Sequence, residues 1–211
     1  MRALLVGATG VVGREILRRL LAEPRYERVT VIARRPLPPE QTSTASAALE
    51  VRVTDFDRLD EHPRWFGADH VFCALGTTIR QAGSQERFRR VDFDYPLTVA
   101  RLALAQGARH FLLVSAIGAS ATSRVFYSRV KGELEDAVMA LPYRSVTIAR
   151  PSLLMGDRAQ PRPGEEIGKR LAFLLPSRYK PVSGDAVAAA LVGAALDDAP
   201  GRRIIESRDI R

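Results

Sequence analysis

The sequence has one cysteine, Cys73, and no hydrophobic run near the ~20 residues that a membrane-spanning helix needs. A single cysteine excludes an intramolecular disulfide and any cysteine-rich zinc or iron–sulfur site. A few apolar residues follow Arg2, but Gly7, Gly10 and Gly13 come at once, which is not typical of a signal peptide. We therefore expect a soluble, cytoplasmic protein without a membrane span, in which Cys73 is a small buried residue.

Histidine is also scarce. His62, His70 and His110 match no metal-site spacing, so core or surface roles are favoured over metal binding. Acidic residues are the minority charge, because 32 Lys and Arg face 24 Asp and Glu in 211 residues, a formal net charge of +8. Such an excess can attract nucleic acid, an anionic membrane or an anionic small molecule. The basic residues are mostly scattered arginines, which favours a solvated basic surface, and no nucleic-acid partner is expected.

Short apolar runs alternate with segments of helical periodicity along the chain. Uniformly apolar strands separated by helices indicate a parallel sheet that is covered on both faces. We therefore predict a doubly wound parallel α/β fold with strands in an order close to 3-2-1-4-5-6. The expected strands are Ala3–Val6, Val29–Ala33, Leu49–Val53, His70–Ala74, Phe111–Val114 and Ser145–Ala149, and the expected helices are Val11–Ala22, Gln85–Gln106 with a bend near Pro96, and Arg124–Leu141.

The pattern after Pro151 is less regular. Ile167–Leu175 and Gly184–Leu196 have helical periodicity, and Arg203–Glu206 can form a last strand. This tail is too short for a second domain, so we expect residues 1–211 to form one domain, with 152–182 as a small lid on the substrate side. The basic stretch Ile167–Val182 could be a substrate flap, a membrane-surface helix or a partner helix, but a helix packed over the sheet is favoured.

A glycine-rich turn lies between the first strand and the first helix, and it reads Gly7-Ala8-Thr9-Gly10-Val11-Val12-Gly13. In this context the first glycine allows a tight turn, the second lets a pyrophosphate approach the backbone, and the third packs helix on strand. The N–H groups at the helix start can bind the anion. The sequence therefore predicts a Rossmann fold that binds a dinucleotide, with Gly7, Thr9, Gly10, Val11, Val12 and Gly13 at its phosphates.

The residues after the second strand indicate which dinucleotide is bound. An NAD site carries an Asp or Glu there for the ribose 2′-hydroxyl, whereas this chain has Arg34 and Arg35. Two guanidinium groups suit a 2′-phosphate, so we predict NADP(H) in preference to NAD(H). Asp55, with Phe56 beside it, could accept from the adenine amino group, or Asp55 could equally cap the turn at Asp57.

A strand-end serine, a tyrosine and a lysine are the candidate catalytic residues. Ser115 ends the fifth strand, Tyr127 follows twelve residues later, and Lys131 follows Tyr127 at i+4. On a helix this spacing places Tyr127 and Lys131 on one face, about 6 Å apart along the axis. A nearby ammonium favours the ionised form of a phenol, which makes the pair a plausible general acid/base. Ser115 can donate a hydrogen bond to a substrate carbonyl oxygen.

These features together resemble a known family. The glycine spacing, Ser115 and the Tyr127–Lys131 pair are similar to those of the short-chain dehydrogenase/reductases. More closely, the chain resembles the atypical subgroup that contains the Tat-interacting-protein-like oxidoreductases, over nearly its whole length. The runs that carry the closer resemblance are Arg34-Arg35, Cys73-Ala74-Leu75-Gly76-Thr77-Thr78, Arg90-Val91-Asp92-Phe93-Asp94-Tyr95, Lys131-Gly132-Glu133 and Arg150-Pro151-Ser152.

The resemblance implies roles for individual residues. Tyr127 would be the proton donor, Lys131 would also hold the nicotinamide ribose, and Ser115 would orient the substrate carbonyl. Typical members use a helix asparagine to hold a water molecule that relays the proton, but this chain contains no asparagine. Asp92 would occupy a position comparable to that of the asparagine. The other implied cofactor contacts are Ala74, Leu75 and Gly76 on the adenine-ribose and nicotinamide side, and Pro151 and Ser152 beside the nicotinamide ring.

We therefore predict an NADP(H)-dependent oxidoreductase that transfers a hydride to or from a small carbonyl or alcohol, with Tyr127 as general acid/base. The alternative is a catalytically weak NADPH-binding redox sensor or scaffold that acts through a protein partner, which the missing asparagine and the short substrate region favour. A nucleic-acid-binding protein that uses the net positive charge ranks third. The chain could be a monomer or a homodimer: in the family that it resembles, the helices after the fourth and fifth strands pair two subunits, and the faces of these helices here do not decide between the two states.

Overall fold

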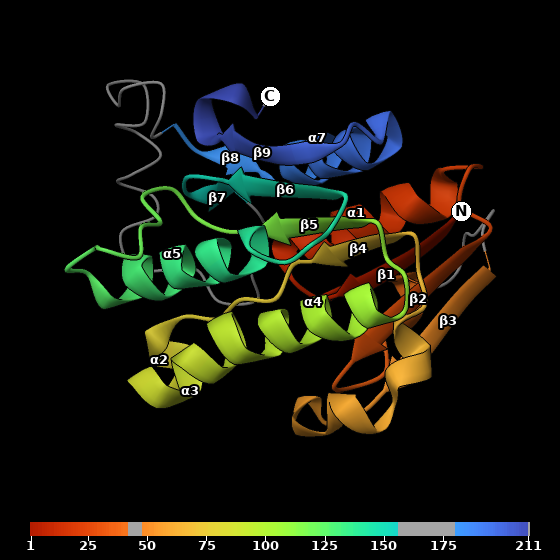
Figure 1. Ribbon diagram of the computed structural model, residues 1–211, viewed down its shortest axis with the longest axis horizontal. Coiled ribbons are helices and arrows are strands. Elements are labelled where there is room, and N and C mark those ends of the chain that lie inside the picture. Colours follow the sequence, from red (N-terminus) through yellow and green to blue (C-terminus); the bar gives the residue numbers. More distant parts are fainter. Residues whose placement is uncertain (42–47, 156–179, 211) are drawn as a thin grey trace.

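A computed structural model describes residues 1–41, 48–155 and 180–210. Its main sheet has seven strands in the order β3-β2-β1-β4-β5-β6-β9, and every pairing in it is parallel (Figure 1). The predicted order 3-2-1-4-5-6 is confirmed. The strands are β1 (Arg2–Val6), β2 (Arg28–Ala33), β3 (Ala48–Val53), β4 (His70–Cys73), β5 (His110–Val114), β6 (Ser145–Arg150) and β9 (Gly201–Glu206), and β7 (Leu154–Met155) with β8 (Val182–Ser183) forms a separate two-stranded sheet.

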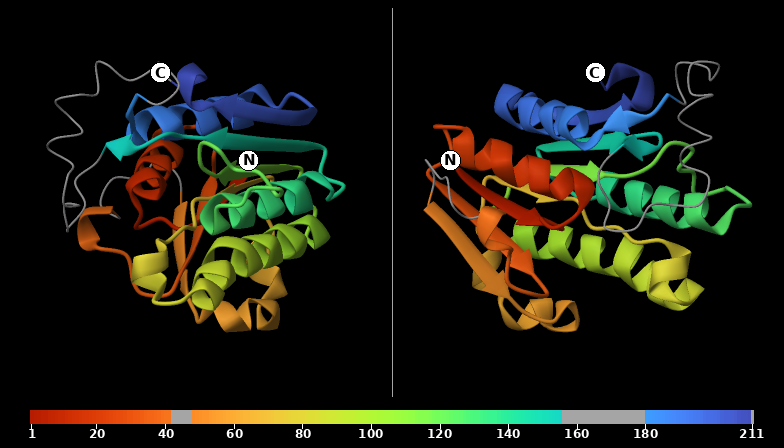
Figure 2. Two further views of the ribbon diagram at one scale, coloured as in Figure 1. Left: turned by 90° about the vertical axis from the view of Figure 1, so that its left-hand side faces the viewer. Right: turned by 180° about the vertical axis from the view of Figure 1, so that it is seen from behind.

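Helices cover both faces of the sheet because alternate side chains of each strand point to opposite faces. In β1, Ala3 and Leu5 lie in one core cluster, and Leu4 and Val6 lie in the other. The first cluster is covered by α1 (Val11–Ala22) and α7 (Gly184–Asp197), which are in front in the right-hand view of Figure 2. The second is covered by α4 (Tyr95–Ala105) and α5 (Phe126–Met139), with two 3-10 helices, η2 (Phe56–Glu61) and η3 (Pro63–Phe66).

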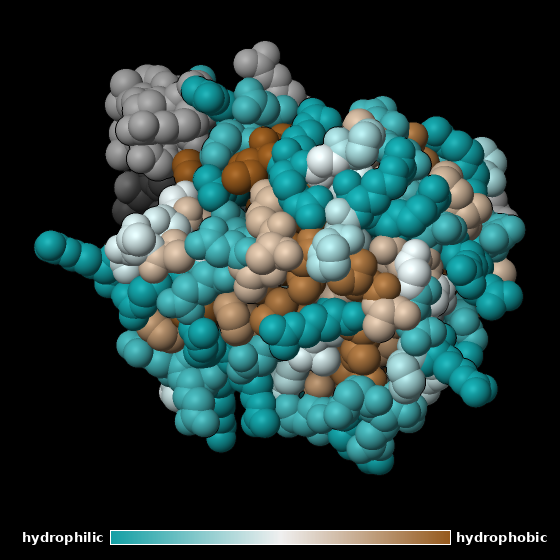
Figure 3. All heavy atoms as spheres, viewed as in Figure 1, coloured by the Kyte–Doolittle hydropathy of each residue, from teal (hydrophilic) through white to brown (hydrophobic). Residues whose placement is uncertain are grey.

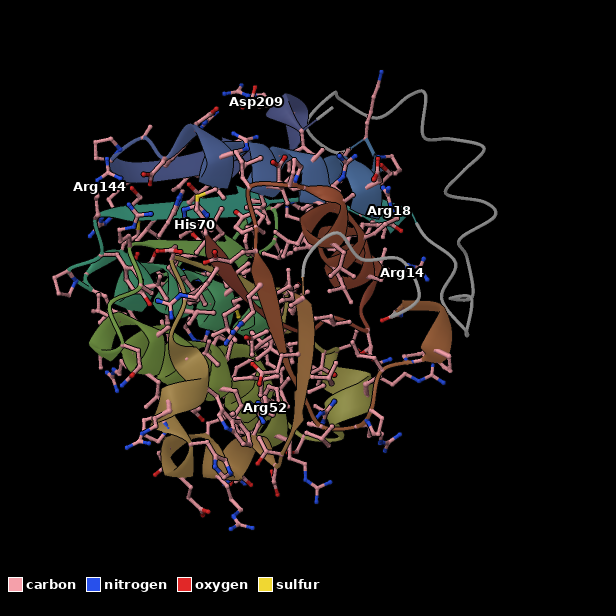
Figure 4. All side chains as sticks on the ribbon, turned by 90° about the vertical axis from the view of Figure 1, so that its right-hand side faces the viewer. Arg14, Arg18, Arg52, His70, Arg144 and Asp209 are labelled. Carbon is pink, nitrogen blue, oxygen red and sulfur yellow. The ribbon has the colours of Figure 1, made fainter. Side chains whose placement is uncertain are left out.

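Helix α1 has the predicted bounds and packs against α7. Ion pairs connect the two helices. The carboxylate of Asp185 at the start of α7 accepts hydrogen bonds from Arg18 at 2.6 Å and from Arg19 at 2.9 Å. Figure 4 labels Arg18 on α1, together with Arg14 one turn earlier. The start of α7 lies close to the start of α1, since a β-carbon added at Gly184 would lie 2.6 Å from the carbonyl oxygen of Val11.

The helical segment expected at Gln85–Gln106 is not a single regular helix. It divides into α3 (Gln85–Arg89), a π-helical turn (Arg90–Asp94) and α4, and a short helix α2 (Ile79–Ala82) that was not predicted precedes it. The π-helical turn lies just before Pro96, near which a bend was predicted, and the bend itself stays a prediction. Proline has no N–H to donate to the carbonyl four residues earlier, so the helix must adjust before it. The N–H of Tyr95 instead bonds the carbonyl of Arg90, five residues earlier.

The C-terminal strand adds a seventh strand to the predicted six. It is longer than the expected Arg203–Glu206, and it pairs in parallel with β6. Arg202 on β9 donates to the carbonyls of Met139, Leu141 and Tyr143 at 3.0, 2.7 and 2.9 Å, respectively. These carbonyls lie at and just beyond the end of α5, where a helix leaves carbonyl groups without intrahelical partners. The last strand therefore anchors the end of the helix that carries Tyr127 and Lys131.

Three expectations fall wholly or mostly on segments outside the described residues. The helix expected at Ile167–Leu175 lies wholly there, and so do most of the lid at 152–182 and of the basic stretch Ile167–Val182. The division into one domain and a lid stays a prediction. Within residues 1–41, 48–155 and 180–210, no helix combines the length and apolar character that crossing a membrane requires.

Figure 3 shows the face of the molecule that α4 and α5 cover. Hydrophobic residues gather in the middle of this face, and hydrophilic residues surround them. Partly buried hydrophobic side chains that pack on the core beneath include Leu102 and Leu104 on α4 and Ala137 and Met139 on α5. Pairing of two subunits through these helices stays a prediction.

A pair of histidines lies in the core, as favoured by the sequence, but the fold also brings them together. His70 and His110 are partners in the register of β4 and β5, and their ring centroids lie 5.9 Å apart (Figure 4 labels His70). The hydroxyl of Tyr26 lies 2.7 Å from Nδ1 of His70, and Nε2 of His110 lies 2.9 Å from the hydroxyl of Thr147. Burial lowers the pKa of both rings, that of His110 to about 4.

This burial predicts a loss of stability in mild acid. His110 has a lower pKa in the folded than in the unfolded chain, so the unfolded chain binds the proton first as the pH falls. The free energy of unfolding should therefore decrease from about pH 6.5 to about pH 4, with His110 contributing about 3 kcal/mol at most. Urea unfolding at about pH 7 and about pH 4.5 measures the decrease.

His110→Phe should make that decrease smaller because it removes the titrating ring. The control is His62→Gln, which replaces a histidine that stacks on Trp65 outside the buried pair. An unchanged pH dependence in His110→Phe would show that His110 does not contribute.

Candidate active site

The glycine-rich turn is built from backbone packed against backbone. Gly7 has a φ of +85°, a conformation that favours glycine. A β-carbon added there would lie 2.4 Å from the carbonyl oxygen of Ala74, and one at Gly13 would lie 2.0 Å from the carbonyl oxygen of Gly7. The N–H of Gly10 donates to that same Gly7 carbonyl at 3.1 Å. The tight turn at Gly7 and the close packing at Gly13 are therefore as predicted from the glycine spacing, whereas the approach of a pyrophosphate at Gly10 stays a prediction.

The start of α1 suits an anion. Gly10 is its N-cap and provides no side-chain hydrogen bond, and the first turn contains no acidic residue. The first N–H groups of a helix lack intrahelical partners and carry the positive end of its dipole. Thr9 and Gly10 are exposed, whereas Val12 and Gly13 are buried. The residues of this turn thus fit the pyrophosphate of a dinucleotide, with backbone groups as donors.

The residues after β2 and β3 lie at the same edge of the sheet as this turn. Val6 is the partner of Ile32 in the β1–β2 register, so Arg34 and Arg35 follow β2 beside the turn that follows β1. Both arginines are exposed and not part of a helix or strand. Within the described residues, neither arginine forms an ion pair, which fits the prediction that they are available to a 2′-phosphate.

Asp55 and Phe56 differ in what they can offer a nucleotide. Asp55 caps η2, because its Oδ1 accepts from the N–H of Asp57 at 3.0 Å, so the capping interpretation is confirmed. Its contact with adenine stays a prediction. Phe56 is buried against Tyr95, with ring centroids 5.6 Å apart, so only its backbone is left to contact a cofactor.

The end of β4 lies between the phosphate-binding turn and the candidate catalytic lysine. On one side, Ala74 contacts Gly7 as described. On the other, a β-carbon added at Gly76 would lie 3.5 Å from Oδ1 of Asp92 and 3.8 Å from Nζ of Lys131. Ala74 and Leu75 are half-buried, and Gly76 is exposed. The sequence-predicted residues Ala74, Leu75 and Gly76 thus lie where the two parts of the site meet.

Tyr127 and Lys131 lie in the first two turns of α5, as the sequence predicted. Lys131 is 4% exposed, and its Nζ lies 2.8 Å from the carboxylate of Asp92. Burial acts to lower the pKa of Lys131, but the charges of Asp92 and Tyr127 outweigh it and leave the pKa raised. Tyr127 is half-buried and packs against Phe88, with ring centroids 5.5 Å apart. Asp92 thus lies directly against the lysine.

Ser115 belongs to a buried polar network. Its hydroxyl donates to Oε1 of Glu135, which also accepts from Nε of Arg150 at 3.2 Å, and Arg150 in turn donates to Glu206 at 3.1 Å. Hydrogen bonds to Glu135 raise the pKa of the Arg150 guanidinium. The serine hydroxyl has one proton to donate, so it must turn from Glu135 before it can bond a substrate oxygen.

The two residues predicted to flank the nicotinamide ring have protein partners. Pro151 is buried, and its carbonyl accepts from the N–H of Ile117 at 2.9 Å. The N–H of Ser152 donates to the hydroxyl of Ser207 at 3.1 Å, and its own hydroxyl donates to the carbonyl of Lys180. Their contact with a cofactor stays a prediction.

Glu135 and Arg150 are residues of this region to which sequence reasoning gave no role. A signal was present, because Tyr127, Lys131 and Glu135 follow one another at intervals of four and therefore share one face of α5. Two charged residues on a buried helix face require partners. The sequence alone could not say that Arg150 is one of them.

The fold and this site define a class of protein, the NAD(P)-binding proteins with a Rossmann fold. The chain belongs to the NAD(P)H-binding family, whose pattern matches residues 7–198. Protein HTATIP2 of Rattus norvegicus is 40% identical to it over 184 residues, which cover 87% of this chain and 74% of that protein. Protein FMP52, mitochondrial, of Eremothecium gossypii is 34% identical over 223 residues, which cover 100% of this chain and 96% of that protein. The predicted family resemblance is confirmed.

Solved structures show the same fold at lower identity. A 3-oxoacyl-(acyl-carrier protein) reductase from Brucella melitensis in complex with NAD has a TM-score of 0.76 and 16% identity, covering 99% of this chain and 96% of that chain. MoeE5 in complex with UDP-glucose and NAD has a TM-score of 0.74 and 15% identity, covering 97% of this chain and 75% of that chain. The predicted Rossmann fold is confirmed. The cytoplasmic location stays a prediction.

The packing of the turn predicts that Gly13→Ala disrupts it. The added methyl group would meet the backbone of Gly7 at 2.0 Å, and a backbone atom cannot move aside as a flexible side chain can. We expect a loss of about 2 kcal/mol or more in the free energy of unfolding, with loss of NADPH binding. Thermal unfolding and nicotinamide fluorescence measure the two effects.

Gly193→Ala is the matched control, because Gly193 also lies in a helix but has no atom within 4 Å of an added β-carbon. That variant should gain about 0.5–1 kcal/mol from its helix propensity. Equal behaviour of the two variants would contradict the tight packing of the turn.

Proposed function

We propose that the protein is an NADP(H)-dependent oxidoreductase that acts on a small carbonyl or alcohol substrate. The observation that carries the proposal is the position of the β4 end, where the phosphate-binding turn lies on one side and the buried Lys131 on the other. Ligands of doubly wound folds bind at this carboxyl edge of the sheet. A dinucleotide held by its phosphates at Gly7–Gly13 would extend along the β4 end toward α5.

Each residue of the site has one task in this proposal. Tyr127 gives its phenolic proton to the carbonyl oxygen, and the product is an alcohol. Ser115, once turned from Glu135, donates a hydrogen bond to the same oxygen and stabilises the charge that develops on it. Lys131 holds the nicotinamide ribose and keeps a positive charge near the phenol. When bound, the reduced nicotinamide supplies the hydride that forms the new C–H bond and is itself oxidised.

The preference for NADP(H) is supported by the charges after β2. Arg34 and Arg35 are exposed beside the phosphate-binding turn, and no acidic residue stands there to bind a ribose 2′-hydroxyl. A guanidinium pairs well with a phosphate but gains little from a neutral hydroxyl. The two arginines therefore favour the phosphorylated dinucleotide.

Replacing these arginines tests the preference. Arg34→Ala with Arg35→Ala should weaken NADPH binding about tenfold or more, because charge-assisted hydrogen bonds to the 2′-phosphate are lost. NADH binding should change less than about threefold. Fluorescence titration with both dinucleotides measures this, and Arg64→Ala, an exposed arginine on η3, is the control. Equal affinity of the unchanged protein for NADPH and NADH would contradict the preference.

Replacing Tyr127 tests the reaction. Tyr127→Phe should keep its NADPH affinity and lose about 10²–10⁴ in turnover, because only the transferable proton is removed. The measurement is NADPH oxidation against a broad panel of carbonyl compounds. The matched control is Tyr95→Phe, because Tyr95 is not a candidate catalytic residue and its hydroxyl donates to Asp57. Ser115→Ala in the same assay should lose about 10²-fold in turnover.

Unchanged turnover in Tyr127→Phe would remove Tyr127 from the reaction. Tight NADPH binding with no turnover of any compound would instead favour a redox sensor that signals through a protein partner.

A further inference from the structure

One buried carboxylate links three parts of the site. Asp92 is 0% exposed, and its Oδ1 lies 2.8 Å from Nζ of Lys131 on α5. Its Oδ2 accepts a hydrogen bond from the N–H of Thr77 at 2.8 Å, directly after Gly76. Asp92 itself belongs to the π-helical turn between α3 and α4. The carboxylate therefore connects this turn, the end of β4 and the lysine of α5.

The π-helical turn accounts for the inward position of Asp92. Its neighbour Asp94, two residues later in the same turn, is exposed, whereas Asp92 is buried. A π-helical turn holds one more residue than an α-helical turn, so it changes which side chains face inward, and such turns recur at functional sites. The structure thus selects one carboxylate of this turn for burial and leaves the other in solvent.

A buried ammonium keeps its proton only if a negative charge compensates for the lost hydration. The groups whose charges act on Lys131 include Asp92 from the π-helical turn, Tyr127 from α5 and Cys73 from β4. Burial raises the pKa of the Cys73 thiol to about 12, so this group is uncharged near neutrality. Asp92 is the carboxylate within ion-pair distance of Lys131 in the described part of the chain. Asp92 is therefore the group best placed to compensate the charge of Lys131.

We propose that Asp92 is a positioning residue that keeps Lys131 protonated and fixes its ammonium group beside Gly76. The direct contact at 2.8 Å places an anion on the lysine without an intervening water or an asparagine. The same carboxylate holds the loop after β4 through Thr77, so the charge and the place of Lys131 are set together. The link to turnover rests on the proposed function, but the protonation of Lys131 can be measured without it.

The test observes the lysine directly. The chain contains three lysines, Lys131, Lys169 and Lys180, so carbon-13 NMR of protein labelled at the lysine ε-carbons gives few signals. Lys131→Arg assigns the Lys131 signal, and the exposed Lys180 is a reference in the same spectrum. We compare the unchanged protein with Asp92→Asn, which keeps the shape of the side chain, and with Asp94→Asn, which removes an exposed carboxylate from the same turn.

In the unchanged protein and in Asp94→Asn, the Lys131 signal should stay in its charged position up to the pH at which Lys180 titrates. In Asp92→Asn, it should titrate roughly two pH units or more below Lys180. A Lys131 signal that titrates as before in Asp92→Asn would overturn the proposal. If Asp92→Asn does not fold, the titration of the unchanged protein still tests the proposal. A Lys131 that loses its proton at a lower pH than Lys180 in that protein would also overturn the proposal.

A pH profile separates this role from a structural one. Asp92→Asn should lose about tenfold or more in kcat at about pH 8, and it should recover part of this loss at about pH 6, where Lys131 regains its proton. A purely structural role predicts the same fractional loss at both pH values, and this outcome would overturn the link to turnover. If the unchanged protein turns over no substrate, the proposed function fails, whereas the NMR titration still tests Asp92.

Discussion

The compensation of buried charge is the constraint on which this site depends. Asp92 and Glu135 are both buried, and each has a basic partner, Lys131 or Arg150. A buried charge that loses its partner destabilises a fold by several kcal/mol, so these contacts hold side chains in fixed places as well as satisfying them. Lys131 and Glu135 lie one turn apart on α5. The two pairs therefore fix one face of α5 against the ends of β4 and β6.

The parallel sheet explains why residues so distant in sequence form one site. Every strand of the main sheet runs in the same direction, so the segments that follow β1, β2, β4, β5 and β6 all begin at one edge. The phosphate-binding turn, the two arginines, the β4 end and Ser115 are such segments. The helices then return the chain to the opposite edge. The candidate functional residues therefore lie at one edge of the sheet. The buried histidine pair, at the start of β4 and β5, lies at the other edge.

Much of the fold was predictable because it depends on local patterns. The strand order followed from uniformly apolar strands such as Leu4–Val6 and from the glycine turn after β1, and Tyr127 and Lys131 followed from their i, i+4 spacing. The partners of the buried charges were not predictable in this way. Asp92 and Lys131 are distant in sequence, and only packing brings them together. The commitment of the Ser115 hydroxyl to Glu135 likewise depends on the position of α5 against β5, which no local pattern contains.

The contact between Arg202 and the end of α5 has a consequence for how the protein is made. A domain generally folds as a unit, so a contact that its last strand supplies is made only once that strand has been synthesised. The three carbonyls that Arg202 binds precede it by 59 to 63 residues. During synthesis, the end of α5 therefore lacks its hydrogen bonds from Arg202 until β9 has been translated. The helix that carries Tyr127 and Lys131 is therefore anchored at its C-terminal end only in the completed chain.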